Sequence, residues 1–317
     1  MALIGPHTII EVSIASAYIF VLVIIITSKS VVFKNAFFIL FVATGIADVT
    51  SLLANVLLRM NRELRLGEEF QYVVLYLALA SGISFVVHML GNIFIAVNRY
   101  TSIRHSVIYE EIWTRKNLCT VIAVQYIVSI ACSIYTVTSK LVYIHKEDGT
   151  TILKGFEAHV DVFIRCTYFG VCTIYAIVSV ILNARTLTEW HRISKMTDIS
   201  RNQKHEKRLL LYTLVVFIFT MLMCSQQFTR AISLITGNDQ MYLWASGQFF
   251  WINDIMVSIP PISLIVLSSD LRRHIVDFFR KRRSVGRNVV VEAVFFTRTC
   301  NTTTNPINAG SRKPVSN

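Results

Sequence analysis

Three ionisable residues, Asp48, His88 and Asp254, lie inside long apolar stretches of the chain. A charged side chain facing hydrocarbon at such a position costs about 2.5 kcal/mol or more. We therefore expect the three to face one another in a histidine–carboxyl hydrogen-bond network, with the amides Asn92 and Asn253 nearby. The alternative is that the two carboxyl groups are protonated and are satisfied by whatever neighbours they have. Either way, these groups belong in a protein interior.

A second set of polar residues lies in the later apolar stretches of the chain. Asp161 and Arg165 are spaced i, i+4 and can pair on one helix face. Gln227, Arg230 and Trp251 are candidates for a small-ligand site, since such sites combine aromatic walls with a few polar groups. A structural role for Gln227 and Arg230 is an equal alternative, and Trp244 fits an interfacial anchor better than a ligand contact.

Seven apolar stretches must position these residues. A helix needs about 20 apolar residues to cross a bilayer, and Gly and Pro, which interrupt helices, number only 12 and 5. The sequence therefore predicts an all-α membrane protein, a seven-transmembrane helix bundle. The predicted spans are 8–27, 36–58, 72–97, 118–137, 160–183, 209–235 and 241–267. The first is expected to be a retained helix rather than a signal peptide, because no Lys or Arg precedes it.

The basic residues predict the orientation of the bundle. Loops on one side carry thirteen Lys and Arg against six on the other, and the tail after Leu267 adds ten more to the first side. The positive-inside rule makes that side cytoplasmic and the N-terminus extracellular, which is the arrangement expected in a plasma membrane. Much of the net charge of +12 then faces lipid head groups, and nucleic acid is not an expected partner.

Other classes of function find little support in the composition. Only 16% of residues are charged, too few for a typical soluble protein. The six cysteines show no zinc spacing and fit small buried side chains, so neither a metal nor another cofactor is expected. No phosphate-binding glycine loop or catalytic triad is recognisable, and we expect no enzyme. Because no internal repeat accompanies the seven spans, a transporter is an alternative rather than the first choice.

Several short motifs carry a family resemblance. Asn98-Arg99-Tyr100 ends the third span, Gly45-Ile46-Ala47-Asp48 lies in the second, and Ile259-Pro260-Pro261-Ile262-Ser263 lies in the seventh. Together they resemble the pattern of rhodopsin-like G-protein-coupled receptors. The chain lacks that class's extracellular disulfide, its Cys-Trp-x-Pro motif and the Tyr after the proline in span seven. It looks closer to nematode serpentine chemoreceptors of the Srg superfamily, of class V or class gamma.

The resemblance implies roles for several residues. Asn98, Arg99, Tyr100, Pro260 and Pro261 would serve activation and G-protein coupling. Arg99 would hold the inner ends of helices three and six together, with Glu206 as a candidate partner, because Asn98 replaces the usual acidic neighbour. A simpler alternative is that Arg99 reaches the lipid head groups. Rhodopsin-like receptors bind sodium near Asp48, but His88 argues for a hydrogen-bond network instead.

The segment after the seventh span predicts a short amphipathic helix. Leu271, Ile275, Phe278 and Phe279 recur on one helix face and basic residues interleave with them. We assign 1–283 to the receptor domain, including this helix, and 284–317 to a disordered cytoplasmic tail. The expected function is a G-protein-coupled chemosensory receptor, acting in sensory transduction and chemotaxis, with a small extracellular ligand and a heterotrimeric G protein as partners. The alternative is a membrane transporter or ligand-gated channel.

Overall fold

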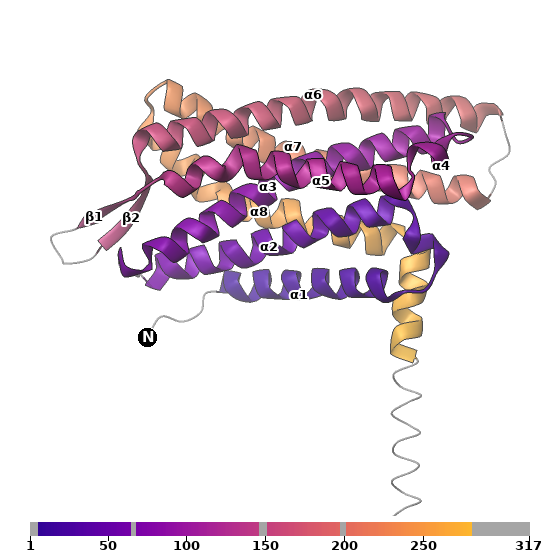
Figure 1. The fold of residues 1–317 in the computed structure, drawn as a ribbon, viewed down its shortest axis with the longest axis horizontal. Helices are drawn as coiled ribbons and strands as arrows, with labels where there is room; N and C mark the ends of the chain where they lie inside the picture. Colours follow the sequence, from indigo (N-terminus) through magenta and orange to yellow (C-terminus); the bar gives the residue numbers. More distant parts are fainter. Residues whose placement is uncertain (1–5, 65–67, 146–150, 197–200, 281–317) are drawn as a thin grey trace, which may run out of the picture. The chain divides into compact units, whose positions relative to one another are not determined.

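A computed structural model describes residues 6–64, 68–145, 151–196 and 201–280 of the chain. Seven helices within these ranges are long and apolar enough to cross a membrane, and in residues 1–271 they form a bundle (Figure 1). They are α1 (Pro6–Thr27), α2 (Ala36–Leu64), α3 (Gln71–Arg104), α5 (Arg115–Ser133), α6 (Ala158–Met196), α7 (Arg201–Ile235) and α8 (Asp239–Leu267). The predicted seven-helix membrane fold is confirmed.

The helices begin and end where the local chemistry allows it. The Thr114 side chain accepts a hydrogen bond from the backbone of Asn117 at the start of α5. The Asn238 side chain does the same for Met241 at the start of α8. Gly237, with φ of 65°, lets the chain turn back directly after α7, a conformation that costs glycine little. Short connections of this kind place consecutive helices antiparallel and side by side.

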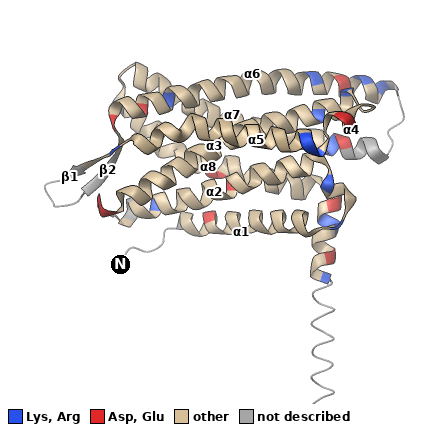
Figure 2. Ribbon diagram, viewed as in Figure 1, with Lys and Arg blue, Asp and Glu red and all other residues tan. Residues whose placement is uncertain are grey.

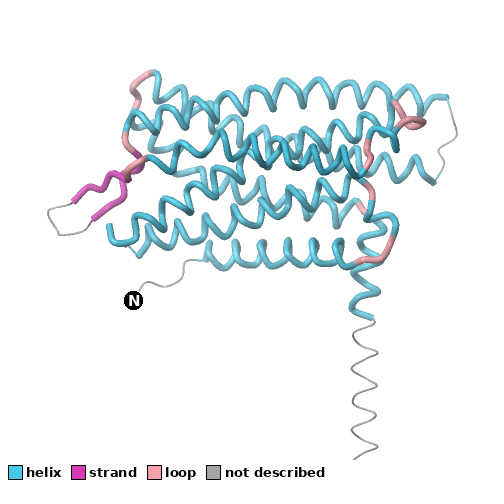
Figure 3. The backbone as a smooth tube through the Cα atoms, viewed as in Figure 1, coloured by secondary structure: helices cyan, strands magenta, loops and turns pink. Residues whose placement is uncertain are grey.

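Some shorter elements were not predicted from the sequence. Between α5 and α6, β1 (Leu141–His145) pairs antiparallel with β2 (Thr151–Phe156), as Figure 3 shows at one end of the bundle. A short helix α4 (Tyr109–Ile112) follows α3 at the opposite end. Three 3₁₀ segments, η1 (Val31–Lys34), η2 (Glu68–Phe70) and η3 (Ile134–Thr138), also lie at helix ends. The hairpin is too short for its alternation to stand out beside seven apolar spans.

Helix α3 lies at the centre of the packing. It contacts α2, α5, α6 and α7, and its buried residues include several polar ones, such as His88, Asn92, Asn98 and Arg99. Outward-facing positions on the other helices carry exposed apolar side chains, for example Ile9, Ile177 and Ile218. Polar groups inside and apolar groups outside are what a lipid environment requires.

Charged residues are distributed unevenly along the bundle. Figure 2 shows Lys and Arg gathered at the end where α4 lies and where α6 ends, with few in the middle. The chain continues after α8 as a helix over residues 269–280, which confirms the predicted helix for that part, and Phe278 and Phe279 pack ring against ring at 5.8 Å. The remainder of the predicted amphipathic segment, 281–283, and the tail 284–317 lie outside the described residues.

Candidate functional site

Asp48 of α2 and His88 of α3 form the centre of a buried polar network. His88 Nδ1 lies 2.7 Å from Asp48 Oδ1, and the Tyr18 hydroxyl of α1 donates to Asp48 Oδ2 at 2.8 Å. On the other side of the ring, Asn92 Nδ2 lies 2.8 Å from His88 Nε2. Donation from Nδ1–H to the carboxylate and from Asn92 to Nε2 satisfies both ring nitrogens of a neutral imidazole. The network therefore connects α1, α2 and α3 through Asp48.

Helix geometry explains why these groups meet. His88 and Asn92 are spaced i, i+4 and so lie one above the other on the face of α3 that points into the bundle. Thr220 of α7 also approaches, with its hydroxyl 3.5 Å from His88 Nε2. Tyr18 and Thr220 were not singled out from the sequence, since a lone hydroxyl in an apolar helix carries little signal by itself.

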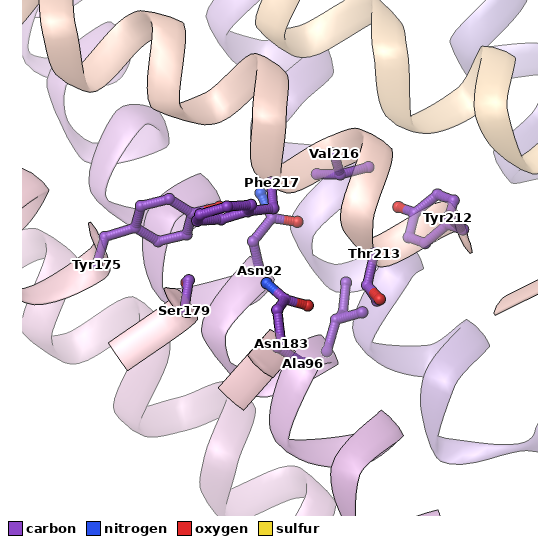
Figure 4. Close-up of a pocket in the computed structure, with 10 residues that line it drawn as sticks. Asn92, Ala96, Tyr175, Ser179, Asn183, Tyr212, Thr213, Val216 and Phe217 are labelled. Atoms are coloured by element: carbon purple, nitrogen blue, oxygen red, sulfur yellow. The ribbon is translucent and has the colours of Figure 1, made fainter. Parts of the chain in front are cut away.

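A small cavity of about 10 Å³ adjoins this network (Figure 4). Asn92 lines it together with Tyr175, Ser179, Asn183 and Tyr212, and Figure 4 shows Asn92, Asn183 and Tyr212 around one space. The Tyr212 hydroxyl is buried without a hydrogen-bond partner among the described residues. The cavity has about the size of one water molecule, which is too small for an organic ligand.

Asp254 does not join Asp48 and His88, and the expected network is corrected on this point. It lies instead beside Arg59 of α2, whose Nη2 is 3.4 Å from Asp254 Oδ2. The same Nη2 lies 2.7 Å from Oε1 of Glu11 in α1. Asn253 is buried, and its Nδ2 has no acceptor within the described part of the chain. A second polar cluster, Glu11–Arg59–Asp254, thus links α1, α2 and α8.

The separation of the two clusters follows from their positions on α2. Asp48 and Arg59 are eleven residues apart, which corresponds to about 16 Å along a helix. The expectation that Asp254 meets Asp48 rested on the cost of a charge facing hydrocarbon, and that cost does not determine which buried groups meet. The predicted second span ended at residue 58, but α2 continues to Leu64, and Arg59 is buried. Glu11, a single acidic residue in an apolar span, was the missed signal.

Arg99, near the C-terminal end of α3, contacts Glu206, the candidate partner given in the sequence analysis. Its Nη1 lies 3.1 Å from Glu206 Oε2 of α7, and its guanidinium stacks 4.8 Å from the ring centre of Phe37 in α2. Arg99 Nη2 also donates to Asn98 Oδ1. The Ser102 hydroxyl donates to the same Glu206 oxygen at 3.2 Å. A buried arginine thereby holds α2, α3 and α7 together.

The short helix α4 is attached to the same end of α3. Asn98 Nδ2 donates to the Tyr109 hydroxyl at 2.9 Å, and the Trp113 indole donates to Thr101 Oγ1 at 2.8 Å. The Tyr100 ring, by contrast, lies near His105 and is only partly buried. Asn98 therefore links Arg99 to α4 by accepting from one and donating to the other.

Pro260 and Pro261 lie inside α8, where they are buried. Each removes a backbone donor from the helix interior, which weakens the hydrogen-bond ladder at that point. They separate the Asp254 part of α8 from its end at Leu267. Such a pair of prolines is a natural place for the helix to bend.

The expected ligand residues fall into two places. Arg230 of α7 is buried and lies 5.7 Å from the ring centres of both Tyr242 and Phe249. The Tyr242 hydroxyl in turn donates to Asp161 Oδ2 at 2.6 Å. Asp161 also pairs with Arg165 at 3.0 Å, the i, i+4 spacing expected from the sequence.

Gln227 is buried, and its Nε2 has no acceptor among the described residues. Trp251 lies elsewhere, with its ring 4.1 Å from that of His7 in α1. Trp244 is 63% exposed, as an interfacial anchor would be. Gln227 and Arg230 therefore do not share a site with Trp251.

The chain matches one family model, that of the serpentine type 7TM GPCR chemoreceptor Srv, over residues 8–281. No curated protein matches it. The serpentine chemoreceptor type expected from the sequence is confirmed. The matching family is Srv, whereas the Srg assignment names a different family of the same nematode type.

Proposed function

Because this chain belongs to the Srv family of serpentine 7TM chemoreceptors, we propose that it binds a small extracellular ligand and activates a heterotrimeric G protein. In this proposal it lies in the plasma membrane with its N-terminus outside and its C-terminal tail in the cytoplasm. The basic end of the bundle then faces the cytoplasm, in keeping with the positive-inside rule.

The ion pair between Arg99 and Glu206 carries the proposal. It joins α3 to α7 at the basic end of the bundle, where a cytoplasmic partner would bind. The Glu206 side chain is 31% exposed, so water and salt weaken the pair, and a modest change in free energy can open it. A ligand that stabilises the open arrangement by a few kcal/mol is then enough to shift the population.

The length of α6 and α7 supports a docking role for the same end. Both continue well beyond the predicted spans, which end at 183 and begin at 209. Arg104 of α3 pairs with Glu189 of α6 there, at 2.5 Å. Opening of the Arg99–Glu206 pair would release α7, while the Arg104–Glu189 pair would keep α6 tied to α3. Movement of α7 away from α3 would then expose a surface between these two helices for the G protein.

The direct test is nucleotide exchange by a heterotrimeric G protein in cell membranes that contain the receptor. Wild-type protein should raise the exchange rate above that of membranes without it. Arg99→Ala should remove most of this increase, because in this proposal the Arg99 side chain that Glu206 releases contacts the G protein. Surface expression of both proteins, measured with an extracellular tag, serves as the control. An Arg99→Ala protein with full activity would refute the role of Arg99. Absence of exchange with every G-protein class tested would refute the proposed coupling.

A further inference from the structure

A cavity of about 110 Å³ lies between α1 and α8, next to the Glu11–Arg59–Asp254 cluster. Asp254, Ser258 and His7 supply its polar lining, and Ile10, Ile14, Trp251 and Ile255 supply its apolar walls. A cavity of roughly 150 Å³ accommodates benzene, so this one suits a ligand of about five non-hydrogen atoms. Its lining has the mixed character of a small-ligand site.

The charges beside this cavity do not balance. Glu11 and Asp254 contribute two carboxyl groups, and Arg59 is the basic side chain paired with both. The two carboxyl groups lie close enough to interact directly. In an apolar setting an uncompensated negative charge is costly, so the pair must either hold a proton between them or receive a second cation.

Several buried atoms at this place lack a partner. His7 Nδ1 has no hydrogen-bond donor among the described residues, and Asp254 Oδ1 and Glu11 Oε2 receive one only where the two carboxyl groups share a proton. Asp254 is 8% exposed and lines the cavity, and Glu11 is 1% exposed. All three atoms can accept hydrogen bonds and the first two belong to acidic groups. Unpaired acceptors of this kind favour a ligand that brings donors and positive charge.

The aromatic groups fit the same ligand. The rings of His7 and Trp251 meet edge to face at 4.1 Å at the cavity wall. An aromatic face attracts an organic cation, and Trp does so most strongly. The cluster around Arg230 has more basic groups, since Arg165 pairs with Asp161 there and Arg230 lies over the Tyr242 ring, whose hydroxyl donates to the same Asp161.

We propose that the cavity between α1 and α8 binds a small organic ammonium ion, with Asp254 as its counter-ion and His7 and Trp251 against its apolar part. The ammonium group would take the place of the proton shared by Glu11 and Asp254. Arg59 would then remain paired with Glu11. Binding itself does not depend on G-protein coupling, but the idea that this ligand is the chemosensory stimulus rests on the proposed receptor function.

Three molecules of matched size test the proposal: isobutylamine, the neutral isostere isobutanol, and propionic acid. Calorimetric titration of the purified full chain in lipid nanodiscs should show saturable binding of isobutylamine. The alcohol and the acid should bind at least about tenfold more weakly, because they lack the positive charge. Equal binding of isobutylamine and isobutanol, or no binding of the amine, would overturn the proposal.

Two variants locate the site. Asp254→Asn should weaken amine binding by about tenfold or more, and it leaves Glu11 and Arg59 as a balanced pair, so the protein should still fold. Asp161→Asn makes the same change of charge in the cluster of Asp161, Arg165 and Arg230, and this variant should bind the amine as wild type does. Ile10→Trp, at a position that is 51% exposed, should fill the cavity and abolish binding without disturbing the core. Unchanged binding by either Asp254→Asn or Ile10→Trp would refute the assignment.

A parallel measurement of nucleotide exchange separates this proposal from the proposed function. Amine binding without any change in exchange would support the site and argue against the amine as a signalling ligand. Exchange by the wild-type receptor with no amine binding would support G-protein coupling and refute the ammonium site.

Discussion

His88 Nδ1 lies 2.7 Å from Asp48 Oδ1, and both side chains are 1% exposed. The contact ties α2 to α3 in the interior of the bundle, where both groups are shielded from bulk solvent. Since the same carboxylate also accepts from Tyr18 of α1, one acidic side chain connects three helices. The loss of the Asp48 carboxylate would therefore break the contacts of α2 with both α1 and α3 in this network.

Replacement of Asp48 should therefore destabilise the protein. Asp48→Asn weakens two hydrogen bonds to a charged acceptor and should lower the free energy of unfolding by about 2 to 3 kcal/mol. Tyr18→Phe removes one of them and should cost about 1 kcal/mol. Thermal unfolding of the purified proteins in one detergent gives the comparison.

Ser16→Ala provides the control for this series. Its hydroxyl bonds only the Val12 carbonyl of its own helix, so the change should be close to neutral. The structural role of the network would be contradicted if Asp48→Asn unfolded at the same temperature as wild type. It would also be contradicted if Ser16→Ala unfolded at as low a temperature as Asp48→Asn.

Glu206→Gln should raise the basal activity of the receptor. The substitution removes the charge that holds Arg99 and keeps the size of the side chain. A partly exposed ion pair contributes about 1 kcal/mol, so exchange without ligand should increase about fivefold. Nucleotide exchange in receptor-containing membranes measures this directly.

Glu110→Gln is the matched control for Glu206→Gln. Glu110 is an exposed acidic residue of α4 at the same end of the bundle, and its neutralisation should leave basal exchange unchanged. If both variants raise exchange equally, the effect comes from surface charge rather than from the Arg99–Glu206 pair.

The sequence predicted the helices of this protein better than the contacts between them. Seven apolar spans stand out because hydrocarbon tolerates few polar residues, and the structure has its long helices at these places. The contact between Arg99 and Glu206 was expected from the resemblance to rhodopsin-like receptors. Asp48 and His88 were expected together because a charged group that faces hydrocarbon is costly.

The relative heights of the helices could not be predicted. Asp254 pairs with Arg59, about three turns of α2 away from Asp48, because helix height depends on loop length and tilt rather than on hydropathy. Tyr18 and Glu11 also contribute to the two clusters through α1, and nothing in their local sequence distinguishes one cluster from the other. Contacts between helices require the packed structure.

The orientation of the bundle is open to a simple experiment. An epitope tag at the N-terminus should bind antibody on intact cells, and a tag at the C-terminus should bind only after permeabilisation. The expectation follows from the excess of Lys and Arg at the end of the bundle that carries α4. Staining of the C-terminal tag on intact cells would show that the orientation is the reverse of the expected one, and a cytoplasmic G protein could then not reach Arg99.

Gly91 of α3 lies at a close approach of α2 and α5 to α3. A Cβ atom there would overlap Thr44 Oγ1 of α2 and would lie 2.7 Å from Gln125 Nε2 of α5. These two groups already bond each other at 3.2 Å, and Gln125 also donates to the Val87 carbonyl of α3 at 2.9 Å. Gly91→Ala should therefore force the helices apart and lower the free energy of unfolding by about 1 to 3 kcal/mol.

Two further variants decide whether close packing is the cause. Gly170→Ala makes the same change in α6, where a Cβ atom would meet nothing within 4 Å, and it should leave the protein as stable as wild type or slightly more so. Thr44→Ala removes the atoms that the new methyl group would overlap, so the double variant Gly91→Ala/Thr44→Ala should be less destabilised than the two single changes predict when added. Thermal unfolding of the four proteins measures both effects. Strict additivity, or equal destabilisation by Gly91→Ala and Gly170→Ala, would show that the loss comes from glycine's backbone freedom and not from contact between α2 and α3.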